Sequence, residues 1–109
     1  MNQRFNPYLQ MKGLRILHCV ARYRKLTWDD KAVLSQLMEF NGEDKKTPDI
    51  VSALMEELAL TEEEVTDSIR HLQTKEFIEL IKVGENQYDY DILPHKVFFA
   101  KSIEEVASL

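Results

Sequence analysis

The three histidines and the single cysteine of this sequence, His18, His71, His95 and Cys19, are types that often take part in catalysis or metal binding. His18 and Cys19 are neighbours, but neighbouring side chains on a helix point about 100° apart, so they do not form a nucleophile–base pair. The histidines are far apart in the chain and the cysteine stands alone, so no ligand spacing typical of a zinc site occurs. The sequence also lacks a glycine-rich phosphate loop and a nucleophile elbow. We therefore expect no metal, no cofactor and no enzymatic activity.

The charged residues are distributed unevenly along the chain. The net charge is −5, yet residues 1–25 contain 6 basic residues and no acidic one. Residues 26–109 hold the other 8 basic residues and all 19 acidic residues. This asymmetry is typical of a basic segment that meets a polyanion such as nucleic acid. A solvated helix that neutralises the acidic remainder within the fold explains the same charges equally well.

The size and composition suit a single domain. The chain has 109 residues, 44% of them hydrophobic, which is enough to fill one core. No apolar run approaches the roughly 18 residues that a membrane-spanning helix needs, so we expect no membrane partner. The first 25 residues lack the pattern of a secretory signal, and the lone Cys19 excludes an internal disulfide. We therefore expect a cytoplasmic protein.

Two helices are predicted in the first part of the chain. Apolar residues at helical spacing indicate a helix over residues 8–24, although Gly13 weakens its first half, so that a start after Gly13 is the alternative. A second helix is expected to begin at Thr27, whose hydroxyl suits a helix N-cap, and to end at Asn41-Gly42.

Two further helices follow after a charged loop. Thr47-Pro48-Asp49 combines a capping residue, a proline suited to the first turn and an acid that favours the helix dipole. The break at residues 59–60 is followed by a capping box, in which Thr61 and Glu64 satisfy each other's backbone amides. The predicted fourth helix spans residues 61–75.

The period of the pattern changes after this helix. Residues 77–83 are β-prone, residues 84–86 form a turn, and residues 88–92 alternate between apolar and polar side chains, which predicts a β-hairpin. Residues 95–108 are expected to form a last helix that mediates a homodimer, the alternative being that this helix folds back on its own domain. The expected dimer contacts are Val97, Phe98, Ile103 and Val106.

The register of residues 50–72 resembles that of a helix-turn-helix. Apolar residues lie on the first helix and in the turn, and Thr61 is followed by apolar residues four, eight and eleven places later. With the hairpin, the order resembles a winged helix-turn-helix DNA-binding domain, which implies a mainly α fold with a small β wing. Residues 26–34 are similar to the helix entry of winged domains in phage and plasmid replication initiators and in related regulators. We expect a basic segment at 1–25, a core winged helix at 26–92 and a C-terminal helix at 93–109.

The resemblance implies that helix 61–75 lies in the major groove of double-stranded DNA and presents the side opposite Val65 and Ile69. Carboxylates such as Glu63 and Asp67 on that side would repel phosphates, whereas Arg70 and Thr74 suit base reading. Phosphate attraction would come from basic residues elsewhere. The candidate DNA-binding residues are Arg15, Arg22, Arg24, Lys25, Thr66, Arg70, His71, Thr74, Lys75 and Lys82.

Two functions follow from these features. The one we favour is a DNA-binding regulator of transcription or replication, expected in a phage or another mobile element. The alternative is an acidic winged-helix adaptor or inhibitor that docks on a basic protein partner and does not bind DNA. A mimic of nucleic acid is one form of this alternative. Fold alone does not distinguish the two.

Overall fold

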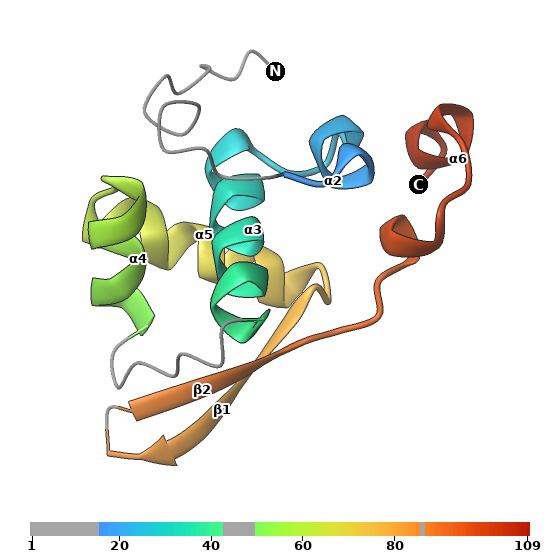
Figure 1. Cartoon of the computed structure of the whole chain (residues 1–109). Helices are drawn as coiled ribbons and strands as arrows, with labels where there is room; N and C mark the ends of the chain where they lie inside the picture. The colour runs from blue at the N-terminus through green and yellow to red at the C-terminus, as the bar shows by residue number, and fades with distance from the viewer. Residues whose placement is uncertain (1–15, 43–49, 86) are drawn as a thin grey trace.

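A computed structural model of the chain describes residues 16–42, 50–85 and 87–109. It is mainly helical, with one antiparallel hairpin after the principal helices, which is consistent with a winged helix-like fold (Figure 1). The elements in chain order are α2 (His18–Arg22), α3 (Trp28–Gly42), α4 (Ile50–Leu58), α5 (Glu62–Thr74), β1 (Ile78–Gly84), β2 (Gln87–Ile92), the 3-10 helix η1 (Lys96–Phe99) and α6 (Ile103–Ala107).

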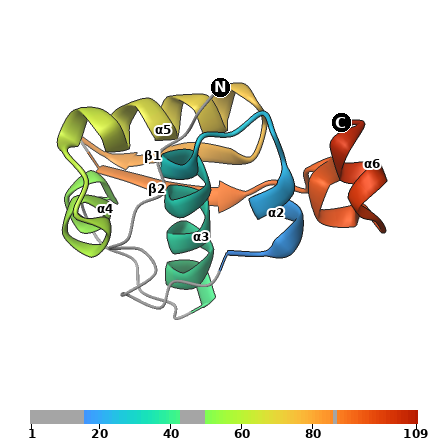
Figure 2. The same cartoon turned by 90° about the horizontal axis from the view of Figure 1, so that it is seen from above.

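Helix α3 forms the centre of the core. It stands between the other helices, with α4 towards one end of the domain and α2 and α6 towards the other (Figures 1 and 2). The predicted apolar stripe of this helix is buried at Ala32, Val33, Leu37 and Phe40. Neighbouring positions are buried as well, including Leu34, because α2, α4 and α5 all contact the helix.

The predicted pair of helices around the turn at residues 59–60 is confirmed. Helix α4 buries Ile50, Leu54 and Leu58, and α5 buries Val65, Ile69 and Leu72 together with Ser68, which the apolar pattern does not mark. Ala59 ends α4 with a φ of 53°, in the left-handed region that favours glycine. The chain therefore turns sharply before α5.

The predicted capping box begins α5. The Glu64 amide donates to the Thr61 hydroxyl over 3.1 Å, and the Glu64 carboxylate accepts from the Thr61 amide over 2.9 Å. Two backbone donors at the start of the helix are thus satisfied locally.

The hairpin is attached to the central helix. Its strands pair with Ile78 opposite Ile92 and Leu80 opposite Tyr90, and β1 starts one residue later than expected. The Tyr90 hydroxyl donates a 2.5 Å hydrogen bond to the backbone carbonyl of Leu37 in α3. Burial raises the pKa of Tyr90 to about 12, and the charge of Asp89 acts in the same direction.

The first described helix is shorter than predicted. Helix α2 ends at Arg22 because Tyr23 adopts extended backbone angles and turns its ring into the core. There the Tyr23 ring meets Phe77 and His95 edge-on, with centroids 5.8 and 5.7 Å away. The part of the predicted helix before residue 16, with Gly13, lies outside the described residues.

The prediction of one helix over residues 95–108 is wrong. The segment forms η1 and the short α6, separated by extended backbone at Ala100 and Ser102. Each piece has its own cap: the Val97 amide donates to His95 Nδ1 over 3.1 Å, and the Glu105 amide donates to the Ser102 hydroxyl over 3.1 Å. Two local caps favour two short helices over one continuous helix.

Candidate nucleic-acid interface

The outward side of α5 is the first part of the candidate interface. Because Val65, Ile69 and Leu72 pack into the core, the opposite side of the helix lies at the surface. Three of its residues, Thr66, Arg70 and Thr74, follow one another at intervals of four. All three are exposed, together with Glu62, Glu63, Glu64, His71 and Gln73.

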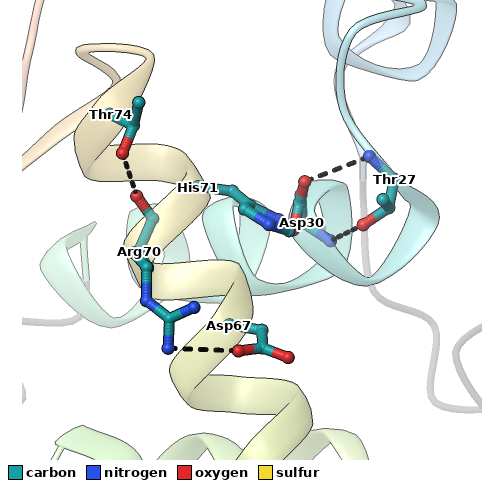
Figure 3. A network of polar contacts seen from close by, with 6 residues as sticks. All are labelled: Thr27, Asp30, Asp67, Arg70, His71 and Thr74. Atoms are coloured by element: carbon teal, nitrogen blue, oxygen red, sulfur yellow. Dashed lines mark hydrogen bonds and ion pairs between the residues drawn. The ribbon is translucent and has the colours of Figure 1, made fainter.

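Arg70 already has a partner on this surface. Its guanidinium lies 3.2 Å from the Asp67 carboxylate, and the Arg70 side chain is 66% exposed (Figure 3). The Thr74 hydroxyl donates to the Arg70 carbonyl over 2.9 Å, so in this state it turns back toward the helix. A pair this exposed contributes about 0–1 kcal/mol. Arg70 can therefore exchange Asp67 for another acceptor at little cost.

His71 is held by the N-terminus of α3. Its Nδ1 lies 3.2 Å from Oδ1 of Asp30, whose side chain is only 2% exposed (Figure 3). Asp30 also accepts from the Thr27 amide over 3.1 Å, and its own amide donates to the Thr27 hydroxyl over 3.0 Å. The predicted cap at Thr27 is thus a reciprocal one, and His71 joins it to α5. In this arrangement His71 positions α5 against α3.

The second part of the candidate interface is an open pocket of about 490 Å³ at the C-terminal end of α5. Arg24 and Lys25 of the basic segment line it together with Lys75, the C-cap residue that follows α5. Lys31 and Trp28 of α3 complete its wall, and none of the described residues that line it is acidic. We call this pocket the basic pocket. Three of the candidate DNA-binding residues, Arg24, Lys25 and Lys75, thus lie around one cavity.

Lys31 is the residue of this site that the sequence reasoning missed. It is 5% exposed, its ammonium donates to the Ala21 carbonyl over 2.7 Å, and it lies 4.4 Å from the centre of the Trp28 ring. Burial lowers the pKa of Lys31, while the nearby charge of Asp30 acts in the opposite direction. The three-residue spacing of Trp28 and Lys31 on one helix was the available signal for their contact.

The remaining candidate residues lie elsewhere. Arg22 lines a separate pocket of about 290 Å³ between α2 and α6, and Lys82 is exposed on β1 opposite Tyr88. Arg15 lies outside the described residues. The structure therefore does not bring all the basic residues to one surface.

The residues predicted for a dimer interface are mostly turned inward. Val97 and Val106 are buried in the core of the single chain, which excludes them from an exposed contact surface. Phe98 is half-buried, with its ring edge-on to Phe77 at 6.0 Å. Only Ile103 among the four is exposed, at 55%. The homodimer and its contacts stay predictions, and Ile103 is the one of the four predicted contacts that this chain exposes.

The described residues offer neither a cluster of metal ligands nor a membrane-spanning helix. In the part of the chain that the structure describes, no three or more His, Cys, Asp or Glu side chains gather as metal ligands would. No helix within the described ranges has both the length and the apolar character required to cross a membrane.

The structure agrees with the family resemblance in shape. The order of helices and hairpin is compatible with a winged helix, and Ala59 takes the left-handed turn conformation between α4 and α5. The finer resemblance, to replication initiators and transcriptional regulators, stays a prediction. Comparison of the chain with models of known protein families, with curated proteins and with solved structures found no match.

Proposed function

We propose that this chain binds double-stranded DNA through the C-terminal half of α5 and so regulates transcription or replication. One observation carries the proposal: Lys75, the residue that follows the exposed Thr74, lines the basic pocket together with Arg24 and Lys25. A surface that reads DNA needs polar side chains for base edges and cations for phosphates close to one another. The C-terminal half of α5 offers both.

The side chains that would contact base edges are Thr66, Arg70 and Thr74, which form a row on the exposed side of α5. A helix rises about 1.5 Å per residue, so successive members of this row are about 6 Å apart along the axis. Arg70 can donate two hydrogen bonds to one guanine, a contact that contributes about 1–3 kcal/mol of discrimination. Thr74 is free to turn its hydroxyl from the Arg70 carbonyl to a base or phosphate.

The acidic residues of α5 limit the direction from which DNA can approach. Glu62, Glu63 and Glu64 occupy the first turn, where they favour the helix dipole and where Glu64 completes the cap. A duplex that approached this end would meet like charge. The proposed contact is therefore centred on Arg70 and Lys75, away from the first turn.

The test is a titration of labelled mixed-sequence duplex DNA, followed by fluorescence anisotropy at several salt concentrations. We expect binding at low salt, with log affinity falling against log salt by about 0.9 for each phosphate neutralised. Arg70→Ala should weaken binding to a selected sequence more than binding to random DNA. Lys101→Ala is the control, since it removes one exposed cation just before α6. No binding even at low salt would contradict the proposal.

A second candidate function has an observation of its own in its favour. The first turn of α5 exposes three consecutive carboxylates, and Asp29 of α3 lies close enough to Glu64 for that charge, after burial, to raise the pKa of Asp29. Such an acidic end suits a basic protein partner, as an adaptor or inhibitor would need. A chain that ignores DNA at low salt but binds a Lys/Arg-rich peptide, with binding lost in Glu63→Gln, would support this alternative.

A further inference from the structure

The basic pocket brings together charges that repel one another. Arg24, Lys25, Lys31 and Lys75 all line it, and no described acidic side chain does so, in a protein whose net charge is −5. Like charges around one concave surface raise its positive potential and concentrate anions there. The chain as a whole is acidic and attracts cations, whereas the four basic side chains around this cavity make the cavity attract anions.

Lys31 makes this preference stronger than surface cations alone would. Its ammonium is buried, and burial disfavours the charged form because water is removed from it. The Ala21 carbonyl, the face of Trp28 and the nearby charge of Asp30 offset part of this loss. An anion in the pocket would offset more of it and would also relieve the repulsion among the four cations.

We propose that the basic pocket is a binding site for a phosphate group. The phosphate oxygens would accept hydrogen bonds from Arg24, Lys25 and Lys75. The buried ammonium of Lys31 would attract the bound phosphate electrostatically. Arginine and lysine donors suit phosphate because bonds between charged partners are about twice as strong as neutral ones. The volume of about 490 Å³ lies within the roughly 300–1,000 Å³ typical of small-molecule sites, so the pocket has room for a phosphate ester.

The phosphate can belong to a small ester or to the backbone of nucleic acid, since both present the same oxygens. In the nucleic-acid case the inference rests on the proposed function and deepens it, because it assigns one backbone contact to this pocket. In the small-ester case it is independent of DNA. The experiment therefore uses both kinds of ligand.

Trp28 provides the readout, because it lines the pocket and is the single tryptophan of the chain. Inorganic phosphate and pyrophosphate are titrated while tryptophan emission is followed, with sodium chloride added to hold ionic strength constant. We expect a saturable change with both phosphates and none with chloride alone. Pyrophosphate should bind more tightly, since it carries more charge.

Variants locate the site. Lys25→Gln and Lys75→Gln should each weaken phosphate binding about tenfold, as expected when one bond between charged partners is lost. Lys101→Gln, just before α6 and outside the basic pocket, is the charge-matched control and should change it less than twofold. Lys31 is left unchanged because its ammonium holds the Ala21 carbonyl. Lys25 is exposed, so Lys25→Gln keeps the test decisive if Lys75→Gln fails to fold.

The same variants are then titrated with a short duplex. Phosphate binding without DNA binding would assign the pocket to a small phosphate ester and would contradict only the proposed function. Loss of both phosphate and DNA affinity in Lys25→Gln would assign it to the nucleic-acid backbone. The inference is overturned if neither phosphate changes Trp28 emission beyond the chloride control, or if Lys101→Gln weakens binding as much as the pocket variants do.

Discussion

Replacing Ala59 by glycine should stabilise the protein. Ala59 is exposed and holds a φ of 53°, a left-handed conformation that costs an L-residue with a Cβ about 1–2 kcal/mol. Glycine avoids this cost but loses about 0.4–1 kcal/mol through the greater freedom of its unfolded chain. The net gain for Ala59→Gly is therefore about 0.5–1 kcal/mol. In a domain of this size, that gain corresponds to a rise in Tm of about 2–8 °C.

The matched control is Ala53→Gly in the middle of α4. It makes the same chemical change, so the unfolded chain contributes equally, but here the backbone is helical and the loss should be about 1 kcal/mol. Urea unfolding of the two variants and the parent would measure a difference of about 1.5–2 kcal/mol between them. If Ala59→Gly destabilises the protein as much as Ala53→Gly does, the chain does not turn at Ala59, and α4 and α5 form one continuous helix instead.

Three further predictions concern single side chains. Tyr90→Phe should lose about 1 kcal/mol of stability with its hydrogen bond to the Leu37 carbonyl. Because burial raises the pKa of Tyr90 to about 12 and also raises the pKa of Tyr23, stability of the parent should fall as pH rises above about 10, and this fall should be smaller in the variant. Ultraviolet titration should show one fewer late-ionising tyrosine in the variant than in the parent. Burial lowers the pKa of His95, whose Nδ1 accepts from the Val97 amide, so the folded state favours neutral His95. Urea unfolding should therefore show stability falling as pH drops below about 6.5. His95→Asn should flatten this pH dependence, and an unchanged slope would refute the prediction. Thr61→Ala should cost about 1 kcal/mol by removing the cap of α5, whereas Thr66→Ala on the exposed side should change the melting temperature little.

The local features of the fold could be predicted from the sequence. The capping box of Thr61 and Glu64 depends on residues three positions apart, so the pattern of types is sufficient to find it. The alternation that leads to Tyr90 and Ile92 likewise requires only a period of two. The apolar side of α5 followed from helical spacing, and with it the outward row that contains Arg70.

The features that could not be predicted depend on distant parts of the chain. His71 meets Asp30 across 41 positions, and a spacing rule within one helix does not reach that far. The gathering of Lys25 and Lys75 around one cavity depends on how α5 crosses α3. The sequence predicts one helix over residues 95–108 because the apolar residues there fit helical spacing. Ser102 is a capping residue and marks the break between the two short helices.

Two of the hydrogen bonds that join α3 to other elements, with Tyr90 of the hairpin and with His71 of α5, have a mechanical consequence. Because the hairpin and α5 are both bonded to α3, the distance between them is fixed before a partner binds. A partner that touches both must fit that span or deform itself to do so. For a duplex, whose stiffness depends on its base steps, the energy of that deformation would select among sequences at positions that no side chain touches.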